Sequence, residues 1–435
     1  MTEDDTETPP EQDPQEDAPQ EEAPEQEAPL APLLELRDPL PPVVETPEAL
    51  AATCAAIASG TGPIAIDAER ASGYRYSSRA YLIQLRRVGS GIHLIDPIAF
   101  DTMTPLQEAI GDTEWILHAA SQDLPCLAEV GLRPTALFDT ELAGRLLGYP
   151  RVGLASLVES RLGFRMAKEH SAVDWSTRPL PQPWLLYAAL DVEVLVELRE
   201  LLGQELIETG KDGWAAEEFD ALRGFTPTPR VDAWRRTSGL HRVRGRRALG
   251  AVRALYELRD TIAQDRDVTP GRILPDSAIV AAATEMPVQR RALLRTQGFH
   301  GRGAERYAAR WTAALKEVLE LPEEDLPTRV PRGDGPPLPR AWAEKDPVAA
   351  RRLSLARAAL ATLAEEHDLP VENVLTPDFV RRLLWAPPAT RDPEALADTV
   401  NQRLIEYGAR AWQRQLTAAL LVETILAADQ PPPEE

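Results

Sequence analysis

The chain has 435 residues, of which 43% are hydrophobic and 27% are charged, a composition typical of a globular protein with room for several cores. No apolar run approaches the roughly 18 residues of a transmembrane helix, and the acidic N-terminus is unlike a secretory signal. The two cysteines, Cys54 and Cys126, show no metal-ligand spacing, which fits a reducing compartment. These features argue against a membrane protein or a disulfide scaffold, and we expect a cytoplasmic protein.

The net charge of −22 is unevenly distributed along the chain. Residues 1–40, 41–225, 226–320 and 321–435 carry net charges of −13, −11, +8 and −6. One module is therefore basic inside an acidic protein, which leaves a nucleic-acid partner open despite the low mean charge.

The first forty residues consist largely of Glu, Asp, Gln and Pro. Such a segment cannot bury enough apolar surface to offset the entropy of ordering, so we expect residues 1–40 to be a disordered acidic tail. Either the tail only keeps the protein soluble, or it competes with a polyanionic substrate for the basic module.

Short apolar runs and helical patterns alternate from residue 41 to residue 225, which is typical of an α/β domain. Because Pro is tolerated in the first turn of a helix, the segment Ser121–Pro125 is expected to open one. The other expected strands are 63–66, 81–85, 92–96 and 115–118, and the other expected helices are 104–110, 140–147, 154–162 and 184–207.

The expected strands end near Phe225, and residues 234–320 and 340–430 show helical patterns only. The stretch from Ile262 to Asp276 is similar to the stretch from Leu363 to Asp378, which predicts two copies of one helical module. Residues 321–339, rich in Pro, Gly and charge, are the expected linker between them.

Two carboxylates, Asp67 and Glu69, follow the apolar run Pro63–Ile66. Residues i and i+2 of a strand point to the same face, so both side chains project together from a strand end. Like charges held side by side repel each other, and a bound Mg²⁺ or Mn²⁺, which prefers oxygen ligands, relieves that repulsion. For this pair alone, two solvated carboxylates at a strand edge are the alternative.

Two further acidic residues are placed where the first pair would need them. Asp123 lies beyond the strand that ends at His118, where a simple helix N-cap is the alternative. Asp191 lies four residues after Tyr187 in an expected helix, so the carboxylate and the phenol share one helix face. For Tyr187 alone, a core aromatic side chain is the alternative.

Several stretches accompany these residues in the same order: IAIDAER, YLIQL, LHAASQDLPCL, FDTELAGRLLGY, GLASLVESRLG, DWSTRPL and LLYAALDVEVLVEL. Together they resemble the DEDDy group of 3′→5′ exonucleases and, within it, the ribonuclease D family. The helical modules resemble HRDC domains, the nucleic-acid-binding unit shared with RecQ-type helicases. The resemblance implies a ribonuclease H-like exonuclease domain over 41–225, with a mixed sheet flanked by helices, followed by two all-α HRDC-type bundles.

The same resemblance implies roles for the acidic residues. Asp67, Glu69, Asp123 and Asp191 would bind two divalent cations, Mg²⁺ or Mn²⁺, with Asp67 bridging both. Glu69 and Asp191 would complete the site that activates water, and Asp123 would support the other ion. Tyr187 would orient the attacking water. Four carboxylates balance most of the charge of two such ions.

Other residues near this site are candidates for contacts with nucleic acid. Gln84 could contact the terminal nucleotide, although a polar residue at a strand edge is the commoner case. His118 either orders the turn before Asp123 or is a structural histidine. Lys168 and Arg178 either hold phosphate or fix the loop before the last helix.

Between Ala233 and Tyr256 there are seven arginines and no acidic residue. Arg246 and Arg253 lie seven residues apart on one helical face, and Arg242 lies one turn earlier if the helix extends that far. With Arg247, these side chains are candidates for bidentate contacts with phosphates, and a solvated charged face is the alternative. The second helical module is net acidic, so we expect it to contribute packing or partner contacts.

The leading hypothesis is a metal-dependent 3′→5′ exoribonuclease that trims structured RNA such as tRNA precursors and releases nucleoside 5′-monophosphates. A DNA exonuclease of the Werner type and a non-catalytic nucleic-acid-binding protein on the same fold are the alternatives. A RecQ-type helicase is excluded, because the sequence lacks a Gly-x-x-x-x-Gly-Lys-Ser/Thr loop. We expect a monomer that binds RNA, with DNA as the alternative substrate, and that uses no small-molecule cofactor or membrane partner.

Overall fold

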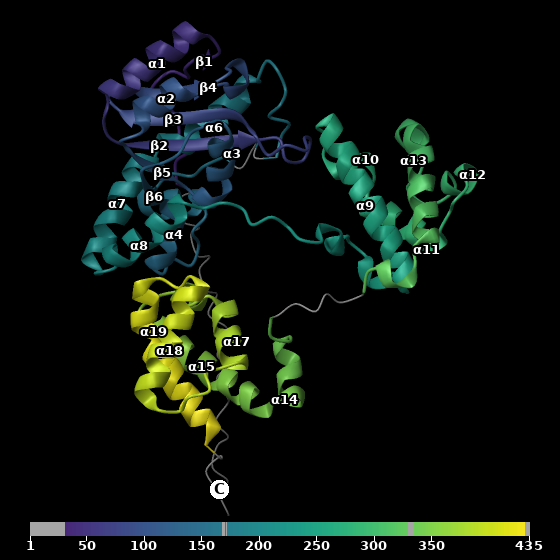
Figure 1. Ribbon diagram of the computed structural model, residues 1–435. Coiled ribbons are helices and arrows are strands. Elements are labelled where there is room, and N and C mark those ends of the chain that lie inside the picture. Colours follow the sequence, from purple (N-terminus) through teal and green to yellow (C-terminus); the bar gives the residue numbers. More distant parts are fainter. Residues whose placement is uncertain (1–30, 168–169, 171, 329–334, 431–435) are drawn as a thin grey trace, which may run out of the picture.

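The computed structural model describes residues 31–167, 170, 172–328 and 335–430. Figure 1 shows an α/β domain followed by two helical modules, one beside the α/β domain and one below it. This arrangement confirms the predicted fold class. Residues 1–30 of the predicted acidic tail lie outside the described residues. The expectation of disorder is wrong for residues 31–40, because the buried Leu34 donates its backbone N–H to the carbonyl of Arg165 over 2.9 Å and packs against Val158.

The α/β domain is built on a six-stranded mixed sheet with the strand order β1-β4-β3-β2-β5-β6. The central strand β2 pairs antiparallel with β3 and parallel with β5. The parallel pairing brings the last part of β2, which carries Asp67, to the same edge of the sheet as the end of β5, from which the chain continues to Asp123. The strands are β1 (Val43–Val44), β2 (Thr61–Arg70), β3 (Ala80–Val88), β4 (Gly91–Ile95), β5 (Glu114–Leu117) and β6 (Ala136–Asp139).

Strand β2 alternates between two cores. Ile64 and Ile66 belong to the core on one face of the sheet, and Ala65 belongs to the core on the other face. Because Asp67 and Glu69 continue the alternation of Ala65, their side chains lie on the second face. The predicted same-face arrangement of the two carboxylates follows directly from this register.

Helices cover both faces of the sheet. Helices α1, α2 and α3 contribute to the core that contains Ile64, whereas α7 contributes to the core that contains Ala65, and α6 contacts β2, β3 and β4. The helices are α1 (Pro47–Ser59), α2 (Thr104–Ile110), α3 (Leu124–Glu129), α4 (Thr140–Leu146), α5 (Leu154–Leu157), α6 (Gln182–Glu193), α7 (Leu195–Glu208) and α8 (Asp212–Arg223).

The single helix expected over 184–207 is wrong in one respect, because it is broken at Val194. This residue has φ −113° and ψ 0° and ends α6 before α7 begins. The side chain of Val194 is buried with Leu34 and Val158 in a small separate core. The break lets α6 lie over β3 and β4 while α7 packs on β5 and α4. Periodicity alone did not reveal it, since both halves keep helical spacing.

The first helical module is an independent bundle around its own core, which includes Trp234, Leu255 and Trp311. Its two long helices are antiparallel, since Arg247 at the start of α9 bonds the carbonyls of Val318 and Leu319 at the end of α13. The helices are α9 (Arg246–Arg266), α10 (Pro270–Ile273), α11 (Asp276–Glu285), α12 (Arg290–Leu293) and α13 (Gly301–Glu320).

The second helical module shares one continuous core with the α/β domain, which includes Phe219 and Trp412. The rings of Trp214 on α8 and Trp412 on α19 stack with centroids 4.8 Å apart. This packing agrees with the structural role expected for the second module. The helices are α14 (Trp342–Lys345), α15 (Pro347–Glu366), α16 (Val371–Val374), α17 (Pro377–Trp385), α18 (Pro393–Tyr407) and α19 (Ala411–Asp429).

Each module contacts the α/β domain through an equivalent turn, the one that follows its first long helix. In the second module, the buried Lys211 ammonium donates to the carbonyls of Leu146 and His367. Gly148, at φ +77°, lies so close that a Cβ there would be 2.5 Å from the carbonyl oxygen of Asp368. Asp368 itself has a positive φ of 48°.

In the first module, the matching turn residue is Asp267, with a φ of 45°. One of its carboxylate oxygens accepts the backbone N–H groups of Tyr76 and Ser77, at 3.1 and 2.9 Å. The Tyr76 hydroxyl donates to Asp260 over 2.9 Å, and Arg272 lies over the ring of Tyr74. These contacts are polar and involve the β2–β3 loop, so this interface differs in kind from the shared apolar core of the second module.

Among the described residues, no helix is both long enough and apolar enough to span a membrane.

Candidate active site

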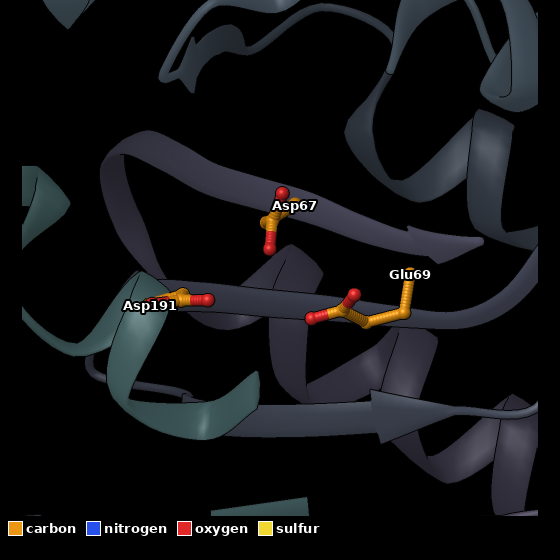
Figure 2. A group of neighbouring side chains, drawn as sticks. All are labelled: Asp67, Glu69 and Asp191. Atoms are coloured by element: carbon orange, nitrogen blue, oxygen red, sulfur yellow. The ribbon is translucent and has the colours of Figure 1, made fainter. Parts of the chain in front are cut away.

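Three carboxylates converge at the end of β2. One oxygen each of Asp67, Glu69 and Asp191 lies within 4.8 Å of the others. Figure 2 shows the three side chains pointing toward a common centre, two from the strand and one from α6. Oxygen ligands at this spacing suit a hard divalent cation such as Mg²⁺ or Mn²⁺.

Burial and mutual repulsion disfavour the charged forms of these groups. Burial is the largest cause that raises the pKa of Glu69 to about 10, and the charges of Asp67, Asp191 and Asp123 raise it further. Burial, followed by the charge of Asp67, also raises the pKa of Asp191 well above its ordinary value. A bound cation removes this penalty, so the donor set fits the predicted metal.

Gln84 orients the central carboxylate. Its side-chain amide donates to Asp67 Oδ2 over 2.6 Å from the opposing position on β3. The side chain of Gln84 is fully buried and does not border the cavity, so it contacts Asp67 from within the protein. The direct contact of Gln84 with a terminal nucleotide stays a prediction, and the contact that the structure shows is the hydrogen bond to Asp67.

Asp123 lies beside the carboxylate cluster at the start of α3 and is 4% exposed. It does not cap α3, since its side chain accepts no hydrogen bond from the first turn of that helix. Its nearest charged partner is Arg70, with Nη2 3.6 Å from Asp123 Oδ1. Asp67 and Asp123 border the same cavity, and burial, followed by the charge of Asp67, raises the pKa of Asp123.

Tyr187 and Asp191 share one face of α6, as their spacing predicts. Burial, and then the charges of Asp191 and Glu69, raise the pKa of the Tyr187 hydroxyl. The phenol therefore stays protonated near neutral pH and can donate a hydrogen bond. It cannot act as a base there.

His118 lies at the edge of the site and bonds Thr140 Oγ1 through Nδ1 at 2.9 Å. Burial lowers its pKa to about 4, so the ring is neutral at pH 7. This side chain orders the turn between β5 and α4 and brings no positive charge to the site.

Asp139 is a supporting residue to which the sequence analysis assigned no role. Its carboxylate accepts the backbone N–H groups of Ala119 and Ala120 at 3.2 and 2.8 Å, and those of Glu141 and Leu142 at the start of α4. Ala119 has a positive φ of 58°, a costly conformation for a residue with a Cβ. An Asp directly before a helix is a typical N-cap, but its link to the turn before Asp123 is a long-range contact.

A cavity of about 540 Å³ lies at this site. The predicted side chains Asp67, Glu69, Asp123, Tyr187, Asp191 and His118 all border it, together with Arg70, Gln122, Glu141 and Met166. The structure thus brings four acidic residues and the tyrosine, from distant parts of the chain, to one hollow.

Comparison with known proteins assigns the family. Residues 41–207 match the family described as 3′-5′ exonuclease, residues 248–315 match the HRDC domain, and residues 335–425 match the 3′ to 5′ exonuclease C-terminal domain. Ribonuclease D of Granulibacter bethesdensis is 31% identical over 80% of this chain and 87% of its own length. The chain belongs to the ribonuclease D family.

Two solved structures extend the likeness. A protein from Bifidobacterium adolescentis, 38% identical, covers 91% of this chain and 99% of its own, with a TM-score of 0.83. Escherichia coli RNase D, 26% identical, covers 84% and 99%, with a TM-score of 0.62, and is described as an exoribonuclease involved in structured RNA processing. As a ribonuclease D family member, this chain is a 3′→5′ exoribonuclease, a hydrolase of phosphodiester bonds.

Two basic residues, Arg178 and Lys168, were predicted either to hold phosphate near this ribonuclease D family site or to fix the loop before the last helix. Arg178 donates to both carboxylate oxygens of Asp96, at 2.6 and 2.8 Å, and to the carbonyls of Tyr81 and Trp175. Its guanidinium therefore fixes the loop before α6. Lys168 lies outside the described residues.

The four arginines predicted on the first HRDC module fall into two pairs. Arg246 donates to the carbonyls of Glu324 and Leu326, and Arg247 to carbonyls at the end of α13. Arg242 and Arg253 are exposed, and Arg253 lies 3.3 Å from Glu257 one turn further on. The first pair fastens the segment after α13, and only the second pair is directed to solvent.

Proposed function

We propose that this chain is a two-metal-ion exoribonuclease that trims the 3′ ends of structured RNA, such as tRNA precursors, and releases nucleoside 5′-monophosphates. The observation that carries the proposal is the convergence of Asp67, Glu69 and Asp191 in one cavity, with oxygens within 4.8 Å of one another. The ribonuclease D family assignment supports RNA as the substrate class, and the description of the Escherichia coli relative supports structured RNA.

Four side chains would hold the cations, with Asp67 shared between two sites. Glu69 and Asp191 would complete one site, and the buried Asp123 would support the other. When bound, a pair of divalent cations lowers the pKa of water and neutralises negative charge on the phosphate and the leaving oxygen.

The remaining residues act by position. Tyr187, protonated and on the same helix face as Asp191, would donate to the attacking water and orient it. Gln84 holds the rotamer of Asp67 through its 2.6 Å hydrogen bond. Asp139 holds the strained turn at Ala119, which places Asp123. The histidine at the cavity, His118, brings no positive charge to the phosphate, because burial lowers its pKa to about 4 and keeps the ring neutral.

The first HRDC module would hold the RNA beyond the 3′ end. Besides Arg242 and Arg253, it presents Arg302, Arg306 and Arg310, spaced by four residues on the exposed side of α13. Within the described residues, these three side chains have no acidic partner within ion-pair distance, which leaves their charge available for phosphates. The module meets the α/β domain at the β2–β3 loop, directly beyond the metal-binding strand.

The test is digestion of matched RNA and DNA oligonucleotides, labelled at the 3′ end, with Mn²⁺ or Mg²⁺ and with EDTA as the control. We expect labelled nucleoside 5′-monophosphate from RNA in the presence of metal only. Release from DNA alone would favour the DNA exonuclease alternative. Binding without release under every metal condition would favour a non-catalytic binding protein.

A further inference from the structure

Arg70 is the residue directly after Glu69 on β2, and it is placed to serve the active site. In a regular strand it would point to the face opposite Asp67 and Glu69. The pairing with β3 is irregular at this point, since Glu69 opposes Leu82 and Arg70 opposes Ala80. Such irregularities re-aim side chains, and Arg70 reaches the cavity with Nη2 3.6 Å from Asp123 Oδ1.

The charge around Arg70 is strongly unbalanced. The cavity is bordered by five carboxylates, from Asp67, Glu69, Asp123, Glu141 and Asp191. Among the lining residues that the structure describes, Arg70 is the one with a permanent positive charge. The single histidine there is neutral at pH 7. Among the described lining residues, Arg70 is therefore the one permanently charged cation that a phosphodiester in this cavity could contact.

The guanidinium of Arg70 makes one long ion pair, with Asp123. Its distance to Asp123 exceeds hydrogen-bond length, and it makes no other side-chain hydrogen bond within the described part of the chain. Its side chain is 29% exposed, so a ligand can reach it. This contrasts with Arg178, whose donors are taken by Asp96 and by backbone carbonyls.

We propose that Arg70 is a phosphate-binding residue of this active site, which pairs with Asp123 in the metal-free protein and with the phosphate of the 3′-terminal nucleotide once a cation is held by Asp123. The proposal rests on the proposed exoribonuclease function and adds to it a residue that contacts the substrate. The exchange has a simple electrostatic cause: a cation held by Asp123 would neutralise the carboxylate that now attracts the guanidinium at 3.6 Å, and would repel the guanidinium toward a bound phosphate. Once displaced, the planar fork of the guanidinium can bind two phosphate oxygens.

The Coulomb effect of Arg70 is consistent with this placement. Its charge lowers the pKa of Asp67, Glu69 and Asp123, although burial outweighs it in each case. In the absence of metal, Arg70 therefore partly neutralises the cluster. A side chain in that position weakens metal binding and strengthens phosphate binding, two effects of opposite sign that a purely structural arginine would not combine.

The test uses titration calorimetry on the full chain, first with Mn²⁺ alone and then with adenosine 5′-monophosphate in the presence of Ca²⁺. Arg70→Gln should bind the nucleotide about tenfold more weakly than the wild type, because a charge-assisted bidentate contact is lost. It should bind Mn²⁺ at least as tightly as the wild type. Arg70→Lys, which keeps the charge without the fork, should show an intermediate loss of nucleotide affinity.

The matched control is Arg79→Gln, which removes the same charge from the same hairpin. Arg79 lies over the ring of Tyr81 and does not border the cavity, so this variant should match the wild type in both titrations. Unchanged nucleotide binding by Arg70→Gln, or a parallel loss of Mn²⁺ affinity and melting temperature, would overturn the proposal while RNA cleavage by the wild type still stands. A wild type that binds nucleotide and metal but cleaves no RNA contradicts only the exoribonuclease mechanism. A wild type that binds neither ligand contradicts both.

Discussion

The side-chain amide of Gln84 donates a 2.6 Å hydrogen bond to Asp67 Oδ2 from the position directly opposite on β3. Both residues belong to the same antiparallel pair of strands, so the register of the sheet sets the orientation of the central carboxylate of the cluster. A hydrogen bond to a carboxylate fixes its rotamer and, in a metal site, tunes its affinity for the cation.

Replacing Gln84 by Met keeps the volume but removes the donor to Asp67. We expect the affinity for Mn²⁺ to fall about tenfold to a hundredfold, because the carboxylate is no longer held in one rotamer. Titration calorimetry measures the change. Gln204→Met, on the exposed surface of α7, is the control and should leave the affinity unchanged. Equal Mn²⁺ binding by the Gln84 variant would show that the sheet alone orients Asp67.

Substitutions of Tyr187 and Asp191 should distinguish an effect on RNA cleavage from an effect on metal affinity. Asp191→Asn should reduce RNA cleavage below detection while RNA binding persists, since it removes one ligand charge. Tyr187→Phe should slow single-turnover cleavage by about a hundredfold and leave Mn²⁺ affinity unchanged, because the hydroxyl orients water and holds no cation. A loss of Mn²⁺ affinity in Tyr187→Phe would contradict that division.

The buried carboxylates predict how stability depends on pH. Glu69 has a pKa raised from 4.5 to about 10, so between these values the folded metal-free protein binds more protons than the unfolded chain. Its free energy of unfolding should therefore fall as pH rises through this window. Melting temperatures in EDTA should decrease from about pH 5 to about pH 9, and Mn²⁺ should flatten this trend. Glu69→Gln should reduce the slope in EDTA, and an unchanged slope would mean that Glu69 is not the source.

The arginines of the first HRDC module should affect either stability or RNA binding, according to whether the side chain is bonded within the protein or exposed. Arg246→Ala should lower the free energy of unfolding by about 1–3 kcal/mol, because the carbonyls of Glu324 and Leu326 lose a charged donor. Arg242→Ala should leave the melting temperature unchanged and reduce the salt slope of RNA binding by about one. Chemical denaturation and binding titrations across salt concentrations measure the two effects, and an exchange of these outcomes would contradict the assignment.

Asp267 should control the position of the first HRDC module. Asp267→Ala removes the acceptor for the backbone N–H groups of Tyr76 and Ser77, so the module should move away from the α/β domain and the radius of gyration should increase. Small-angle scattering measures the change. Asp265→Ala, on the exposed side of α9 just before Asp267, is the control. An unchanged scattering profile for Asp267→Ala would show that other contacts hold the module.

The acidic site could be predicted from the sequence because its spacing follows local periodicity. Strand alternation places Asp67 and Glu69 on one face, and helical spacing places Tyr187 with Asp191. For Asp123, the sequence showed only its place beyond the strand that ends at His118, and the family resemblance supplied its role; the parallel pairing of β2 and β5 that brings it to Asp67 is visible in the structure alone.

What could not be predicted depends on contacts between residues far apart in the chain. The carbonyl partners of Arg246 lie about eighty residues away, so the charge pattern around Arg246 in the sequence does not reveal them. The same holds for Asp139, whose role depends on Ala119, and for the irregular pairing that brings Arg70 to Asp123. The break at Val194 keeps helical spacing on both sides, so periodicity cannot locate it.

The most direct measurement of the central claim is anomalous scattering from crystals of the full chain soaked in Mn²⁺ and adenosine 5′-monophosphate. Two peaks about 3.5–4 Å apart, one bordered by Glu69 and Asp191, the other by Asp123, and both by Asp67, are the result we predict. An absence of peaks at this cluster, with Mn²⁺ bound elsewhere or not at all, would contradict the two-metal mechanism.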